Sequence, residues 1–143
     1  MTVMLDSTVP VMAAIRAALL SDAALSPLIS GIYDRAPTPA RGSYLTIGDT
    51  SADDWSTATE DGQDHMIDVH VWTQPTSQTP ETSTPRALMG HVRRILHNAT
   101  GLTIAMPFNL VTIRVTHQLG PMLDPDGATL HGIVTVRVAV DHP

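Results

Sequence analysis

The chain has 143 residues, a mass of 15.3 kDa and a formal charge of −6, with 43% hydrophobic and 15% charged residues. This length predicts one domain over residues 1–143, and the composition excludes wholesale disorder. The absence of cysteine excludes disulfides and thiolate chemistry. All eight basic residues are arginine and acidic residues outnumber them, which excludes bulk electrostatic binding to phosphates. Since no apolar run approaches ~20 residues and no signal peptide is evident, we expect a soluble protein that is not exported.

The first helical pattern covers residues 9–24. Ser7 is the expected N-cap, and Met12, Ile15 and Leu19 fall on one face of the helix. Ser26 and Pro27 then break the run, and we expect a short turn at 27–29. The sequence therefore predicts one helix followed by a compact turn.

Two strands are expected in the next part of the chain. Residues 44–48 predict a short strand, and residues 49–62 predict a polar loop. Residues 64–73 predict a longer strand, in which Ile67, Val69 and Val71 alternate with polar or amphipathic residues. One face of that strand should therefore lie on the core.

The segment 74–84 consists almost wholly of Pro, Thr, Ser, Gln and Glu, so we expect a flexible excursion there. A second helix is expected over 85–99, with Gly101 as its stop signal. Its apolar stripe consists of four residues, Leu88, Val92, Ile95 and Leu96. This stripe should be buried, while Arg86, Arg93, Arg94 and His97 face away from the core.

Two long β runs, 110–119 and 129–141, close the chain, and Asp124-Pro125-Asp126-Gly127 between them is a strong turn signal. The element order α-β-β-α-β-β indicates an α+β fold. We expect a mostly antiparallel sheet of about four main strands with two helices packed on one face.

Metal and catalytic motifs are weak. His65 and His70 are five apart on a strand, so they should point to opposite faces, and the other His pairs also lack chelating spacing. The acidic residues at 53–54 and 60–61 do not alternate as in an EF-hand loop. There is no G-x-S-x-G motif and no glycine-rich phosphate loop. We therefore expect no catalytic residue, no metal and no cofactor.

The two tryptophans indicate a contact surface. Trp55 lies in a polar loop and Trp72 on the polar face of a strand, where both are exposed unless something covers them. Surface tryptophan is enriched at protein interfaces. The alternative, in which Trp55 covers the sheet edge of its own subunit, stays open.

Several segments occur in an order that resembles the tail-completion, or tail-terminator, family of long-tailed phages and phage-derived gene transfer agents. The similarity covers nearly the whole chain. The segments are Ile32-Tyr33-Asp34, Tyr44-Leu45-Thr46-Ile47-Gly48, Asp54-Trp55-Ser56-Thr57, Thr59-Glu60-Asp61-Gly62, Ile67-Asp68-Val69-His70-Val71-Trp72, Val92-Arg93-Arg94-Ile95-Leu96-His97, Asp124-Pro125-Asp126-Gly127 and His131-Gly132.

The resemblance implies a structural virion protein at the junction of tail and head, assembled in the host cytoplasm. Its expected form is a hexameric ring that caps the tail tube, ends tube polymerisation and joins the head-side connector, while DNA passes through without specific binding. The residues expected at contacts with neighbouring subunits, tube or connector are Asp54, Trp55, Ser56, Thr57, Thr59, Glu60, Asp61, Trp72, Asp124, Asp126 and His131.

Two alternatives remain. One is another neck or tail component, such as a head-closure adaptor or the tube subunit, of which the latter would polymerise into long tubes. The other is a small metal-dependent enzyme. That reading requires Asp61, His65 and His131 to converge in one pocket.

Overall fold

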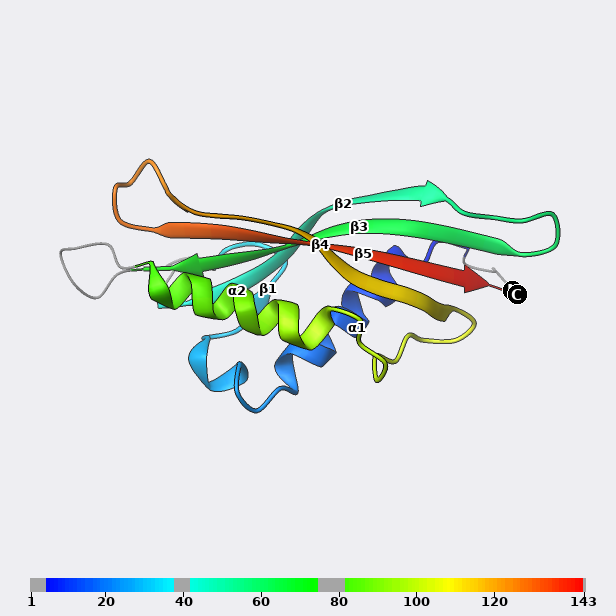
Figure 1. Ribbon diagram of the computed structural model, residues 1–143, viewed down its shortest axis with the longest axis horizontal. Helices are drawn as coiled ribbons and strands as arrows, with labels where there is room; N and C mark the ends of the chain where they lie inside the picture. Colours follow the sequence, from blue (N-terminus) through cyan, green and yellow to red (C-terminus); the bar gives the residue numbers. More distant parts are fainter. Residues whose placement is uncertain (1–4, 38–41, 75–81, 143) are drawn as a thin grey trace.

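The computed structural model describes residues 5–37, 42–74 and 82–142. It has a five-stranded sheet of order β1-β2-β3-β5-β4, with two helices on one face (Figure 1). The elements are α1 (Thr8–Leu20), the 3₁₀ turn η1 (Ser26–Leu28), β1 (Ile32–Tyr33), β2 (Tyr44–Asp54), β3 (Asp61–Thr73), α2 (Ser83–Leu96), β4 (Asn109–Leu123) and β5 (Leu130–His142).

The predicted α+β class, with helices on one face, agrees with the structure. The sheet differs in one respect, because it is mixed and has five strands where about four antiparallel ones were expected. Ile32 and Tyr33 form a parallel pair with Leu45 and Thr46 of β2. A strand of two residues carries no alternation pattern, so its pairing is visible only in the tertiary structure.

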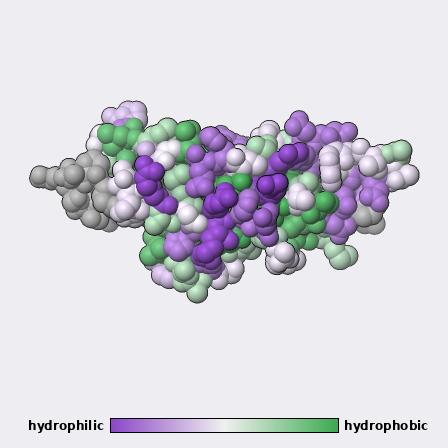
Figure 2. All heavy atoms as spheres, viewed as in Figure 1, coloured by the Kyte–Doolittle hydropathy of each residue, from purple (hydrophilic) through white to green (hydrophobic). Residues whose placement is uncertain are grey.

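The core lies between the helices and the inner face of the sheet. Period-two alternation places Ile67, Val69 and Val71 of β3 on this face, and all three are fully buried. The predicted apolar stripe of α2 packs against these three residues. The other side of α2 faces solvent, and Figure 2 shows hydrophilic residues there, in the centre of the view. The other fully buried apolar residues are Val11, Ile15, Leu19, Leu25, Leu45, Val92, Leu96, Val134, Val136 and Val138.

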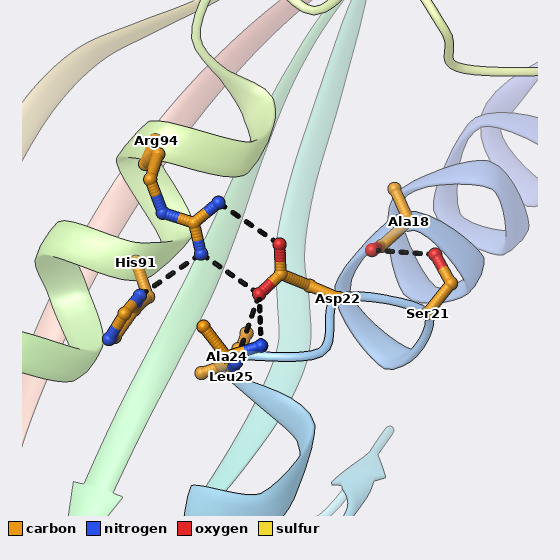
Figure 3. A network of polar contacts seen from close by, with 7 residues as sticks. All are labelled: Ala18, Ser21, Asp22, Ala24, Leu25, His91 and Arg94. Atoms are coloured by element: carbon orange, nitrogen blue, oxygen red, sulfur yellow. Dashed lines mark hydrogen bonds and ion pairs between the residues drawn. The ribbon is translucent and has the colours of Figure 1, made fainter.

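Helix α1 ends at Leu20, earlier than the predicted end at residue 24. Asp22 explains the difference, because its carboxylate accepts the backbone N–H groups of Ala24 and Leu25 and starts a new turn (Figure 3). The same carboxylate accepts two hydrogen bonds from Arg94 of α2, at 3.0 and 2.9 Å. The Arg94 guanidinium holds the pKa of Asp22 well below its usual range. This contact ties the end of α1 to α2.

The other end of α1 contains a buried polar network. Ser7 is at the predicted N-cap position, but its hydroxyl does not cap the helix. It instead donates to Gln63 Oε1 at 2.9 Å and contacts His65 Nε2 at 2.7 Å. Because the hydroxyl proton goes to Gln63, Nε2 of His65 is the donor to Ser7. His65 is fully buried, and its Nδ1 has no hydrogen-bond partner in the described part of the chain.

This network predicts acid sensitivity. Burial lowers the pKa of His65, with the carboxylates of Asp6 and Asp64 only partly opposing it. The unfolded chain, with a His pKa of about 6.5, then binds more protons than the folded chain at acid pH. We expect the free energy of unfolding to fall as pH drops through about 6.5, by up to about 1.4 kcal/mol per pH unit for this group. Urea unfolding between pH 8 and 5 measures the slope.

The matched variant is His65→Gln, which keeps a polar side chain beside Ser7 and removes the titration. Burial also lowers the pKa of His97, so wild type and variant should share part of the slope. The difference between the two slopes isolates His65. Parallel pH profiles would show that His65 does not carry this dependence.

The predicted loop over 49–62 is wrong for most of its length. β2 continues to Asp54 and β3 begins at Asp61, so only residues 55–60 connect them. An irregularity between Gly48 and Thr50 places Asp49 in a left-handed conformation, with φ of 53°. Beyond it the hairpin extends past the helices, where both faces of β2 meet solvent, so polar side chains are compatible with a strand there.

The second half follows the prediction with shifted ends. α2 begins at Ser83 and ends at Leu96, where Asn98, with φ of 56°, provides the left-handed residue expected of Gly101. β4 is longer than predicted, β5 has the predicted length but is shifted by one residue, and β4 has three register irregularities along β5. Most of the predicted excursion 74–84, residues 75–81, lies outside the described residues. No described helix has the length and apolar character needed to span a membrane.

Candidate functional surface

The tip of the β2–β3 hairpin, residues 54–61, is an ordered turn built from its own polar groups. Trp55 N–H donates to Gly62 at 2.9 Å, and Thr57 N–H donates to Glu60 at 2.8 Å. The Ser56 hydroxyl donates to the Asp54 carboxylate at 2.6 Å. These local bonds hold the backbone of the tip without any apolar core beneath it.

Trp55 is the large apolar residue of this tip and is 45% exposed. Its ring lies over Gly62, where a Cβ atom would come within 3.2 Å of the indole and 2.8 Å of the Trp55 carbonyl oxygen. A hollow of about 400 Å³ beside it is lined by four carboxylates, those of Asp54, Glu60, Asp61 and Asp141. The tip therefore presents a half-exposed indole next to concentrated negative charge.

A second group lies on the outer face of the sheet, which is the face turned away from the helices. Trp72 stacks on His131 with ring centroids 3.7 Å apart and on Tyr44 at 6.2 Å. Its indole N–H donates to the Thr46 hydroxyl at 3.0 Å. Trp72 is thus half-buried by neighbours of its own subunit, which the sequence did not show.

Polar side chains lie next to Trp72 and His131 on the outer face. His70 Nδ1 contacts His131 Nε2 at 2.7 Å, and His70 Nε2 contacts Asp49 Oδ2 at 3.0 Å. Asp68 lies beside them and accepts the Thr135 hydroxyl at 2.7 Å. Burial is the main cause that lowers the pKa of His131, followed by the charge of His70.

The predicted Asp-Pro-Asp-Gly turn joins β4 and β5. Gly127 N–H donates to the Asp124 carbonyl at 2.9 Å, and the φ of Gly127 is 74°, a conformation that favours glycine. The Asp126 carboxylate accepts the N–H groups of Ala128 and Thr129, and bonds from Thr129 lower the pKa of Asp126. Asp126 therefore stabilises its own turn.

The structure separates the predicted contact residues into two groups. The tip residues Asp54, Trp55, Ser56, Thr57, Thr59, Glu60 and Asp61 lie at one end of the sheet (Figure 1). Trp72, His131, Asp124 and Asp126 lie toward the other end. Asp61 and Trp72 stand eleven residues apart on β3, which corresponds to about 36 Å. One subunit thus offers two distant surfaces.

The arrangement required for the enzyme alternative is not formed. His65 faces the helices, His131 is on the outer face and Asp61 is at the tip. His65 and His70 do lie on opposite faces, as their spacing predicted. Asp49, Asp68 and His70 were not among the predicted site residues, although the i, i+2 spacing of Asp68 and His70 on a strand already placed both on one face.

Comparison with family models decides the identity. The model of the family described as tail completion protein gp17 matches residues 13–141. The chain belongs to the tail completion protein gp17 family. This confirms the family resemblance found in the sequence and makes the chain a structural protein of a phage-type tail.

A solved structure has the same fold as this member of the gp17 family. It is described as the virion of a native gene transfer agent particle, and the TM-score is 0.77 at 24% sequence identity. The alignment covers 90% of this chain and 92% of that chain. The shared fold therefore covers most of both chains. Comparison with curated proteins gave no match.

Proposed function

We propose that this tail completion protein forms a hexameric ring that caps the tail tube, ends its polymerisation and contacts the head-side connector. The observation that carries the proposal is the family match over residues 13–141. A subunit with contact surfaces at two distant ends suits this role, because a ring at a junction must bind the tube on one side and the connector on the other.

The hairpin tip supplies the features of an association surface. Trp55 is half-exposed on an ordered turn, so little conformational entropy is lost when it binds. The adjacent carboxylates of Asp54, Glu60 and Asp61 suit arginine on a partner, which sets orientation more than affinity. Trp55 is the anchor in this proposal, and the carboxylates define the register.

An open strand edge lies close to the tip. β1 pairs only with Leu45 and Thr46, so residues 50–54 of β2 have no second strand partner in the described part of the chain. Unpaired backbone groups at a sheet edge accept an added strand from another chain. A neighbouring subunit that pairs here would cover the edge and bring its side chains to Trp55. Head-to-tail contacts of this kind close into a ring when the rotation divides the circle.

The charge of the chain fits a ring through which DNA moves. The formal charge is −6, and Asp22 and Asp64 already hold Arg94 and Arg137 in bidentate contacts. Negative walls repel phosphates and leave DNA free to slide. The proposed partners are therefore further copies of the chain, the tail tube protein and the head-side connector. DNA passes through the ring without specific binding.

The test is the particle mass of the purified protein in solution, together with negative-stain images of the protein alone and with tail tubes. We expect six-fold rings, either free or at one end of each tube. Long tubes from the protein alone would assign it to the tube instead. Monomers on tube ends, or rings of another symmetry, would overturn the proposal.

A further inference from the structure

Three side chains of the outer face converge although they are not adjacent in the sequence. One oxygen from each of Asp49 and Asp68 and one ring nitrogen of His70 all lie within 4.8 Å of one another. Asp68 and His70 share the outer face of β3, and Asp49 reaches them from the register irregularity of β2. The tail-capping role uses none of these three groups.

The spacing suits a metal ion. Zinc binds histidine nitrogen and carboxylate oxygen at about 2.0–2.2 Å, which places neighbouring ligand atoms about 3–3.5 Å apart. His70 Nε2 and Asp49 Oδ2 are already 3.0 Å apart. The Asp49 side chain is 76% exposed, so it is free to adjust its position, whereas His70 is held in a buried position.

The Nδ1 atom of His70 has a partner of its own, His131, which fixes the orientation of the His70 ring. His131 Nε2 lies 2.7 Å from His70 Nδ1 and accepts its proton when Nε2 binds a metal. Thr135 likewise donates to one oxygen of Asp68 and leaves the other oxygen available. When Nε2 of His70 carries a proton, it donates that proton to Asp49. A divalent ion bound to Nε2 would take the place of this proton.

Space and charge around the three ligands also favour a cation. Gly48 lies opposite Asp68 in the register, and a Cβ atom added to Gly48 would meet nothing within 4 Å, so room remains for water ligands. Arg137 of this face is paired with Asp64, and Arg114 lies opposite Arg137 on the edge strand β4. In the described ranges, Asp49 contacts His70 rather than an arginine.

We propose that Asp49, Asp68 and His70 form a binding site for one divalent metal ion that accepts both nitrogen and oxygen ligands, such as Zn²⁺. The donor set of one imidazole and two carboxylates suits such an ion better than Mg²⁺, which prefers oxygen ligands and loses its water reluctantly. The site lies within one subunit, so it binds whether or not the ring forms.

The experiment is isothermal titration calorimetry of the metal-free full chain with Zn²⁺, repeated with Mg²⁺, plus visible absorption after addition of Co²⁺. We expect one Zn²⁺ per chain, no saturable Mg²⁺ binding, and Co²⁺ absorption bands typical of a protein-bound ion. Asp49→Asn and Asp68→Asn should each weaken Zn²⁺ binding at least tenfold. Asn suits both places, because it tolerates the left-handed backbone of residue 49 and still accepts the Thr135 hydroxyl at residue 68.

The matched control is Asp53→Asn, which removes an exposed carboxylate from the same strand and should leave Zn²⁺ binding unchanged. Circular dichroism checks that each variant is folded. If both ligand variants bound Zn²⁺ with the affinity of wild type, the ion would be placed at other histidines and the proposal would be overturned. No saturable binding to wild type would overturn it as well, while the ring images remain a separate result.

Discussion

Replacing Trp55 by alanine is expected to abolish ring formation and tail capping while the isolated subunit stays folded. A buried tryptophan at an interface contributes about 2 kcal/mol or more, so each contact should weaken about 30-fold or more. The subunit itself loses little, because the ring of Trp55 is half-exposed and its backbone bond to Gly62 is retained in alanine. Analytical ultracentrifugation and negative-stain images measure assembly, and thermal unfolding measures the subunit.

A matched control is Leu28→Ala, which removes another half-exposed apolar side chain, from η1 on the helical side of the molecule. This variant should assemble like wild type. The prediction for Trp55→Ala is contradicted if the isolated subunit melts several degrees lower than wild type while rings still form at low temperature. Trp55 would then be a packing residue of its own sheet edge, as the alternative interpretation of the sequence holds.

Of the substitutions proposed for this protein, Leu88→Ala is expected to lower the free energy of unfolding the most. Leu88 is almost fully buried on α2, which packs across β3, β4 and β5. Truncation of a buried leucine to alanine costs about 2–5 kcal/mol, since it removes apolar contact and leaves a cavity. A domain of this kind has about 5–15 kcal/mol in total, so the midpoint of urea unfolding should shift strongly.

Leu119→Ala makes the same chemical change on the outer side, where Leu119 of β4 is 44% exposed. Its free energy of unfolding should stay within about 0.5 kcal/mol of wild type. Equal losses in the two variants would mean that the outer face packs as tightly as the inner one. The model of a single core between helices and sheet would then be wrong.

The sequence predicted most elements because their signals are local. Alternation at Ile67, Val69 and Val71 identified β3 and its buried face, and the apolar stripe of α2 identified the second helix. The turn at 124–127 was also readable, since Gly127 supplies the positive φ that the turn requires. In each of these cases one element, taken alone, carries enough residues to reveal its period.

Residues 49–54 of β2 were predicted as a loop because most of their side chains are polar. A strand needs backbone partners more than apolar side chains, and β3 provides them from Gln63 to Ile67. Likewise, β1 has only two residues, and its strand character depends entirely on Leu45 and Thr46 beside it. Pairing between strands decided both, and pairing is a property of two segments.

The contact surface shows the same division. Trp55 and the carboxylates around it could be selected from the local sequence, and the family could be recognised from the order of its motifs along the chain. By contrast, the stacking of Trp72 on His131 joins residues 59 positions apart, and the convergence of Asp49, Asp68 and His70 needs the register of two strands, β2 and β3. By itself, the sequence determined the periodic elements, the acidic balance and the family. Only the tertiary structure decided which side chains meet, because strand register brings distant residues within contact distance and local patterns carry no record of that register.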